Sequence, residues 1–143
     1  MIYLDTSSLL KLLLPEPESP EVLTAVAREP SIAVSSLTEL EARVQLRAMR
    51  LGGELTVRQL ARLETRLAQV QREQPFHAVR LPASLIDSAL RQHTKSARHC
   101  RTLDRLHLAA MEELGIRRLM THDQAQAATA RELGFEVLSP GAI

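Results

Sequence analysis

The chain has 143 residues, of which 45% are hydrophobic, and a formal net charge of +1. This length predicts one compact domain, residues 1–143. The near-neutral charge excludes a protein that coats nucleic acid through charge alone, although a local basic patch can still bind a few phosphates. The three aromatic residues, Tyr3, Phe76 and Phe135, are too few to stack successive bases, so any contact with nucleic acid would depend on the sixteen arginines.

The single cysteine, Cys100, excludes an internal disulfide and a zinc site built from several thiolates. This cysteine usage is typical of a reducing compartment, and we expect a cytoplasmic protein. The first segment lacks the basic start of a signal peptide, and Asp5 and Lys11 interrupt its apolar residues. We therefore expect neither a secreted protein nor a membrane span.

Short apolar runs alternate with helical patterns along the whole chain. Strands are expected at residues 2–4, 32–34, 118–120 and 135–138. Helices are expected at about residues 6–14, 18–28, 37–51, 60–70, 82–90, 102–114 and 124–133. Thr6 can cap the first helix, and Pro15 ends that helix. Strands separated by helices predict an α/β fold with a mostly parallel sheet.

Gly52 and Gly53 separate two amphipathic helical patterns and predict a helical hairpin. The leucines of the second helix follow a narrow seam, which suits packing against one other helix. Most of this apolar surface is expected inside the hairpin, and the remainder would form a groove for an amphipathic partner helix. Leu63 and Leu67 are the first candidates for outward-facing residues of that groove.

Two of the four aspartates follow expected strands. Asp5 comes directly after residues 2–4, and Asp123 comes shortly after residues 118–120. In an open parallel sheet, ligands bind outside the carboxyl ends of the strands, which is where both carboxylates would lie. Each aspartate also has a structural interpretation, since each could cap the helix that follows it. The sequence leaves both interpretations open.

Glu41 and Asp104 lie near expected helix starts. Thr38 and Glu41 have the spacing of a capping box, and Asp104 lies in a first turn, where a negative charge suits the helix dipole. Taken singly, each acid can therefore have a structural role. Together with Asp5 and Asp123, however, these acids can all lie on one rim of the sheet.

Four carboxylates on one rim would raise one another's pKa values, and a counter-ion relieves that cost. Mg²⁺ and Mn²⁺ prefer oxygen ligands, and such an ion can activate a water and stabilise the charge that gathers on a phosphodiester. Ser7 and Thr121 flank the acids and could orient a carboxylate or a metal-bound water. Both hydroxyls could instead satisfy backbone groups at the strand ends.

Four segments carry a family resemblance: YLDTSSLLKLLLPEPES at the start, VSSLTELEARVQL at 34–46, RTLDRLHLAA at 101–110 and LMTHDQAQAATARELGFEVLSPG at 119–141. In this order and spacing, they closely resemble PIN-domain toxins of the VapC type over nearly the whole chain. The resemblance implies a PIN-like three-layer α/β/α sandwich around a mostly parallel sheet. It also implies an endoribonuclease that depends on Mg²⁺ or Mn²⁺, is commonly a homodimer and is held inactive by a VapB-type antitoxin.

By position, the metal-binding acids of that family correspond to Asp5, Glu41, Asp104 and Asp123, and the hydroxyl residues near its metal correspond to Ser7 and Thr121. Glu39 lies two residues before Glu41 and points about 200° away around the helix, so only one of the two glutamates should face the site. Lys11 matches the opening motif without an assigned role. His99 and His107 are candidate general bases, but packing on the buried side of its helix or at an interface is the preferred interpretation of His107.

Two other enzyme classes with acids at strand ends fit less well. A receiver domain needs an acidic pair after the first strand and a late lysine, whereas Asp5 stands alone and the last lysine is Lys95. A phosphatase of the haloacid-dehalogenase type needs a second aspartate where Ser7 stands. The remaining alternative is a catalytically silent PIN domain that binds RNA or a protein. A chelator separates the two, because a nuclease loses its activity and a binding module keeps its affinity.

Overall fold

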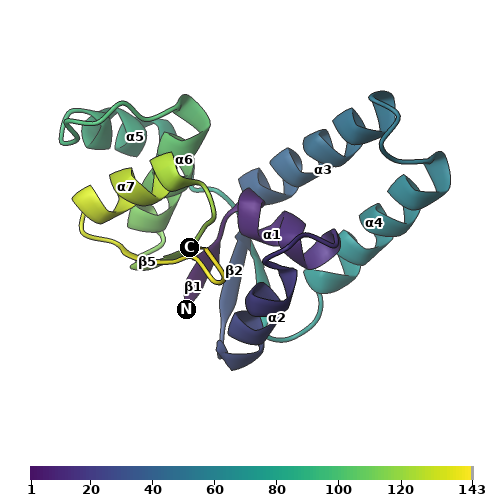
Figure 1. The fold of residues 1–143 in the computed structure, drawn as a ribbon. Coiled ribbons are helices and arrows are strands. Elements are labelled where there is room, and N and C mark those ends of the chain that lie inside the picture. The colour runs from purple at the N-terminus through teal and green to yellow at the C-terminus, as the bar shows by residue number, and fades with distance from the viewer. Residues whose placement is uncertain (143) are drawn as a thin grey trace.

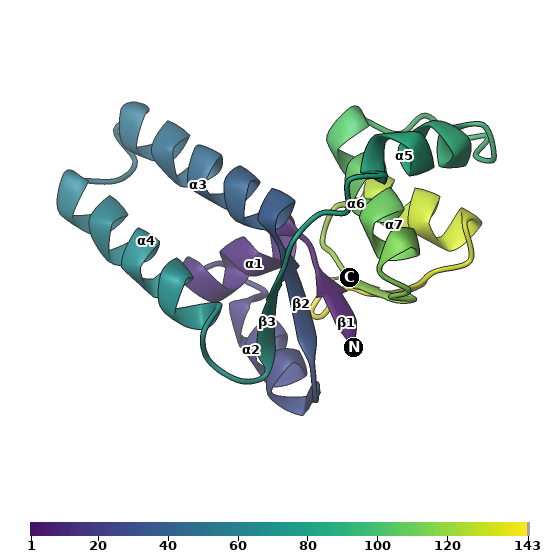
Figure 2. The same ribbon diagram turned by 180° about the vertical axis from the view of Figure 1, so that it is seen from behind.

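The computed structural model describes residues 1–142, and Ile143 lies outside this range. Five short strands form one sheet, namely β1 (Ile2–Leu4), β2 (Ile32–Ser35), β3 (Phe76–Val79), β4 (Arg118–Met120) and β5 (Glu136–Leu138). Their order is β3-β2-β1-β4-β5, and Figure 2 shows β3, β2 and β1 side by side. The chain adds strands on one side of β1 and then continues on its other side. The carboxyl ends of β1 and β4 are therefore the switch point of the sheet.

Seven helices cover the sheet within the described residues: α1 (Thr6–Leu13), α2 (Ser19–Arg28), α3 (Ser36–Leu51), α4 (Val57–Val70), α5 (Leu85–His93), α6 (Thr102–Glu113) and α7 (Gln124–Glu132). Helices α1 to α4 lie on one side, where α3 and α4 project beyond the sheet, and α5 to α7 gather on the other side (Figure 1). The expected three-layer α/β/α sandwich is confirmed, and every strand pair is parallel. None of the described helices has both the length and the hydropathy that a bilayer span requires.

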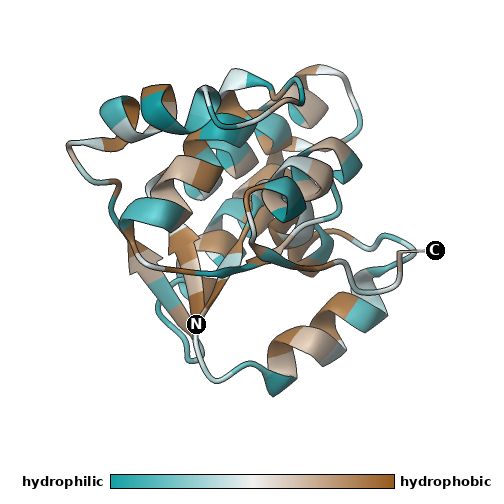
Figure 3. Cartoon of the chain, turned by 90° about the vertical axis from the view of Figure 1, so that its left-hand side faces the viewer, coloured by the Kyte–Doolittle hydropathy of each residue, from teal (hydrophilic) through white to brown (hydrophobic). Residues whose placement is uncertain are grey.

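Alternation along β1 shows how the sheet divides the core. Ile2 and Leu4 pack with apolar side chains of α1 to α4, whereas Tyr3 belongs to the cluster that α5, α6 and α7 form on the opposite face. All three side chains are fully buried. In Figure 3, the hydrophobic colour predominates in the central strands, and hydrophilic colour is frequent on the helices around them. Burial on both faces is the reason why the central strands appear in the sequence as continuous apolar runs.

The first helix begins with the cap that the structural interpretation of Asp5 predicts, and the alternative cap, Thr6, is wrong. Asp5, not Thr6, is the N-cap of α1, since its carboxylate accepts a hydrogen bond from the Ser8 amide at 3.1 Å. Asp123 caps α7 in the same way, with its Oδ1 accepting the Gln126 amide at 2.9 Å. Both aspartates at strand ends are therefore helix caps. Each still has a second carboxylate oxygen for another partner.

The capping box expected at Thr38 and Glu41 is wrong. The N-cap of α3 is Ser35, the last residue of β2, and its hydroxyl accepts a hydrogen bond from the Thr38 amide at 3.1 Å. Thr38 lies inside the first turn, where its hydroxyl donates to the Leu4 carbonyl at 3.1 Å. Glu41 consequently falls in the second turn, beyond the reach of a capping box.

Strand β3 is an element that the sequence analysis does not predict. It pairs only with β2 and forms the edge of the sheet, and its residues are partly exposed. Phe76 packs against the cluster of α1 to α4, and Val79 packs against the cluster on the opposite face. A four-residue edge strand that contains His77 lacks the long apolar run of a central strand, which explains the omission.

Helices α3 and α4 form the expected hairpin, and Gly53 adopts a φ of +82° in its turn, a conformation that favours glycine. The leucine seam of α4 is internal, however. Leu67 is fully buried, and Leu63 packs partly buried against the same core. The outward-facing role expected for Leu63 and Leu67 is therefore wrong. The apolar side chains that the hairpin leaves exposed include Leu40 and Val44 of α3.

Candidate active site

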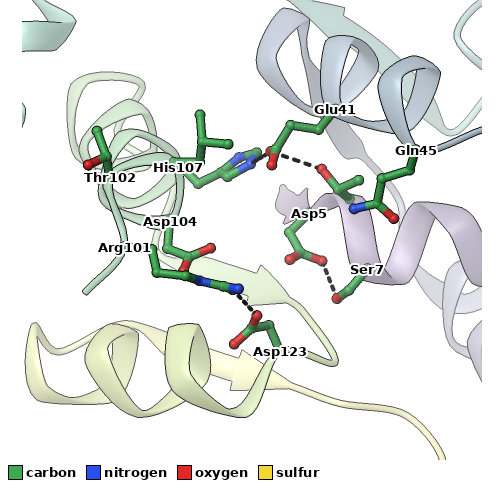
Figure 4. A pocket seen from close by; sticks show the side chains of 11 residues that line it. Asp5, Ser7, Glu41, Gln45, Arg101, Thr102, Asp104, His107 and Asp123 are labelled. Carbon is green, nitrogen blue, oxygen red and sulfur yellow. Dashed lines mark hydrogen bonds and ion pairs between the residues drawn. The ribbon is translucent and has the colours of Figure 1, made fainter. Parts of the chain in front are cut away.

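A cavity of about 330 Å³ opens at the switch point of the sheet. The four acids identified in the sequence line it from four different elements. Asp5 precedes α1, Glu41 lies on α3, Asp104 lies on α6, and Asp123 precedes α7. Figure 4 shows these side chains around one space, with Glu41 and Asp5 on one side and Asp104 and Asp123 on the other. The fold therefore places all four predicted acids at a single cavity.

Asp5 is firmly held at the end of β1, and only 4% of the residue is exposed. The Ser7 hydroxyl donates to its Oδ1 at 2.7 Å, and the Thr121 hydroxyl donates to its Oδ2 at 2.9 Å. Burial raises the pKa of Asp5 above its ordinary value, and the hydrogen bonds, of which that from Ser7 is the strongest, offset only part of this rise. Both hydroxyl residues that the sequence analysis singled out therefore orient this carboxylate.

Glu41 is connected to the core through a chain of buried polar groups. His107, which is almost fully buried, bonds Glu41 Oε1 through its Nε2, and its Nδ1 lies 2.7 Å from the Tyr3 hydroxyl. That hydroxyl lies 2.6 Å from Oγ of Ser35, and the Thr6 hydroxyl donates to Glu41 Oε1 at 3.1 Å. Partial burial raises the pKa of Glu41, but the interactions with His107, Thr6 and Arg101 together outweigh burial, so this pKa lies below its ordinary value. His107 therefore lies on the buried side of its helix, where it orients Glu41.

Arg101 supplies a positive charge to the cavity. Its Nε donates to Oδ2 of Asp104 at 2.7 Å, and its Nη2 donates to Oδ2 of Asp123. The side chains of Asp104 and Asp123 are 12% and 26% exposed, so both ion pairs are partly shielded from water. Among the described residues that line the cavity, Arg101 is the only lysine or arginine.

Other polar residues from the sequence analysis lie elsewhere. Glu39 pairs with an arginine one turn along α3 and does not line the cavity. Lys11 pairs with Glu16 and Glu18, at 2.6 and 2.8 Å, and thereby connects α1 to the segment before α2. His99 borders a separate cavity beside α5. Of the two neighbouring glutamates, only Glu41 faces the acid cavity.

The donor chemistry of the cavity suits a hard divalent cation, because all four acids offer carboxylate oxygens. In the present arrangement, no three His, Cys, Asp or Glu side chains of residues 1–142 are grouped so that they could hold one ion. The guanidinium of Arg101 lies between Asp104 and Asp123, at oxygens that an ion would use. The residues therefore fit a hard divalent cation by their chemistry, and two of the four carboxylates are paired with Arg101.

Tyr3 and Arg101 are outside the set of site residues that the sequence analysis identifies. A signal for Tyr3 is present, because a tyrosine in a buried strand needs a hydrogen-bond partner for its hydroxyl. His107 follows Asp104 by three residues and so shares its helix face. No comparable signal marks Arg101, since its role depends on the direction that a flexible side chain takes.

The chain is similar to known proteins of one family. The family model of the PIN domain matches residues 2–138. Over 149 aligned residues, the chain is 31% identical to ribonuclease VapC47 of Mycobacterium tuberculosis (strain CDC 1551 / Oshkosh), with 100% of this chain and 99% of that protein covered.

Solved structures share the fold of the chain, among them the following two. VapC20 of Mycobacterium tuberculosis, a Sarcin-Ricin loop cleaving toxin, superposes with a TM-score of 0.73 at 17% identity, covering 98% of this chain and 100% of that one. A toxin–antitoxin complex from Klebsiella pneumoniae gives a TM-score of 0.69 at 17% identity, covering 100% of both chains. At this level of identity, the two structures bear on the fold alone.

Proposed function

The chain belongs to the PIN-domain family as a member of the VapC type, and on this basis we propose that it is the ribonuclease toxin of a type II toxin–antitoxin pair and cleaves RNA with the aid of Mg²⁺ or Mn²⁺. The observation that carries the proposal is the convergence of Asp5, Glu41, Asp104 and Asp123 on one cavity at the switch point of the sheet. The relative VapC47, a ribonuclease by name, matches the chain over its full length. Both observations support hydrolysis of RNA phosphodiester bonds at a four-carboxylate site.

In this proposal the four carboxylates hold the metal, and the residues around them set their orientation. Bound Mg²⁺ or Mn²⁺ supplies an activated water and stabilises the negative charge that gathers on the phosphodiester. Ser7 and Thr121 fix the carboxylate of Asp5 through hydrogen bonds to its two oxygens. His107 fixes Glu41. Because these two acids are held in place before an ion binds, they need little rearrangement to receive it.

The proposed protein partner is a VapB-type antitoxin. The solved toxin–antitoxin complex from Klebsiella pneumoniae, which shares the fold, supports this partner. Leu40 and Val44 lie exposed on the helix that carries Glu41, so they offer apolar contacts to an amphipathic antitoxin segment close to the cavity. We further propose that the chain forms a homodimer and that RNA is the substrate.

RNA cleavage by the antitoxin-free chain tests the proposal, with Mg²⁺ or Mn²⁺ in one arm and excess EDTA in the other. Asp5→Asn and Asp104→Asn should each lower the cleavage rate by about 100-fold or more, since each removes a proposed ligand. Asp87→Asn is the matched control, because Asp87 is exposed on α5 and does not line the cavity. Cleavage that persists in EDTA would exclude the metal mechanism.

The two neighbouring glutamates provide a sharper comparison on one helix. Glu41→Gln should remove most of the cleavage activity, whereas Glu39→Gln should retain it, because only Glu41 lines the cavity. Equal losses in the two variants would exclude Glu41 as a ligand. A parent chain that binds RNA equally with and without EDTA, and never cleaves it, would identify the alternative function, a catalytically silent PIN domain that serves as an RNA- or protein-binding module.

A further inference from the structure

Arg101 lines the cavity, and the proposed nuclease activity assigns it no role. It directly precedes α6 and forms no side-chain capping hydrogen bond to that helix. Its side chain is 63% exposed, yet the guanidinium lies over the cavity and pairs with both Asp104 and Asp123 (Figure 4). An exposed arginine can readily be solvated instead, so this placement indicates that the two carboxylates attract it.

The two carboxylates differ in how far they depend on Arg101 for their position. Asp123 is held as the N-cap of α7, through the 2.9 Å hydrogen bond that its Oδ1 accepts from the Gln126 amide. Asp104 lies within the first turn of α6, and Arg101 is the one group that its carboxylate bonds in residues 1–142. To both carboxylates Arg101 contributes its positive charge. Arg101 and His107 are the two described groups of the cavity that can carry a positive charge, fewer than its four carboxylates, so the cavity keeps an attraction for a divalent cation.

We infer that Arg101 is a resident counter-ion of the cavity, which a divalent cation displaces from Asp104 and Asp123 when it binds. This inference rests on the proposed function, because that function requires the divalent cation. A guanidinium keeps its charge at any physiological pH, so Arg101 can release the two oxygens only by rotating away from them. Its exposed side chain has room for this rotation. Arg101 and the cation therefore compete for the same oxygens, and removal of Arg101 strengthens cation binding.

Calorimetric titration of the antitoxin-free chain with Mn²⁺ tests this competition without measuring cleavage. Arg101→Ala should bind Mn²⁺ more tightly than the parent by about tenfold, or about 1.4 kcal/mol. Arg101→Lys keeps the charge but lacks the planar fork that spans two carboxylates, so its affinity should lie between the two. Arg98→Ala is the matched control. Arg98 is an exposed arginine of the same segment, and within residues 1–142 it forms no ion pair with the four acids and does not line their cavity.

Melting temperatures provide an independent measurement of the same competition. In excess EDTA, Arg101→Ala should melt below the parent, because its carboxylates lack their counter-ion. In saturating Mn²⁺ the two proteins should melt together, since Arg101 no longer contacts the acids in either one. The free energy of unfolding that Arg101→Ala loses without metal should equal the free energy of Mn²⁺ binding that it gains, because the two changes belong to one thermodynamic cycle.

The possible outcomes separate this inference from the proposed function. If the parent binds Mn²⁺ and Arg101→Ala binds it equally or more weakly, the inference is overturned and the proposed nuclease stands. Equal strengthening in Arg98→Ala would also overturn the inference, because general charge would then account for the effect. A parent that binds no Mn²⁺ would overturn the inference and the metal-dependent function together.

Discussion

Replacement of Tyr3 by phenylalanine should destabilise the chain by about 2 kcal/mol, because it leaves a buried polar group without a partner. Tyr3 is fully buried, and its hydroxyl lies 2.6 Å from Ser35 Oγ and 2.7 Å from His107 Nδ1. Without that hydroxyl, Ser35 keeps its contact with Thr38 at 3.1 Å. Nδ1 of His107, in contrast, has no other hydrogen-bond partner in the described part of the chain. The phenyl ring itself retains its packing.

This loss converts into a measurable change in melting temperature. The entropy of unfolding is about 2.1 cal/mol/K per residue, which amounts to about 0.3 kcal/mol/K for this chain, so the melting temperature should fall by about 7 °C. Differential scanning calorimetry in excess EDTA measures the shift. Thr24→Val is the control, because it deletes an exposed hydroxyl that bonds only the Pro20 carbonyl, and it should change stability by less than about 0.5 kcal/mol. A Tyr3→Phe protein that melts with the parent would refute the buried chain of polar groups that holds Glu41.

Two further predictions follow from the hairpin. Leu67→Ala should lower the free energy of unfolding by about 2–5 kcal/mol in urea denaturation, because Leu67 is fully buried in the cluster on the α1 to α4 side of the sheet. An unchanged stability would show that α4 is not part of the core. Val44→Glu should weaken antitoxin binding at least tenfold, or by about 1.4 kcal/mol, as measured by calorimetry. Its melting temperature and its rate of RNA cleavage should equal those of the parent. Parent-like affinity of Val44→Glu would place the antitoxin on another surface.

Local patterns in the sequence are sufficient to predict most of the helices and strands. The strands at residues 2–4 and 118–120 are continuous apolar runs, which reflect burial on both faces, and the break at residues 52–53 marks the hairpin turn. Strand β3 escaped prediction because its pairing with β2, rather than any pattern of its own, makes it a strand. The cap of α3 was misassigned for a related reason. Whether Ser35 or Thr38 caps the helix depends on where β2 stops pairing, and pairing is a property of two segments.

The convergence of the acids could also be anticipated from the sequence, because parallel strands bring their carboxyl ends to one edge of the sheet. Asp5 and Asp123 follow two such strands, and the structure places them at one cavity with Glu41 and Asp104. Their roles as caps and as cavity acids were alternatives in the sequence. In the structure, Asp5 and Asp123 do both, since a carboxylate has two oxygens.

Only the tertiary structure decided which groups meet the acids and which face of the hairpin is buried. The Tyr3 hydroxyl meets His107 across 104 positions of the chain, and the side chain of Arg101 turns toward the carboxylates of Asp104 and Asp123. Periodicity identified the apolar stripe that contains Leu67, but a stripe does not specify whether a helix of the same chain or a partner covers it. Hydrogen bonds and ion pairs between side chains depend on distances in space, and these distances are established when the helices pack onto the two faces of the sheet.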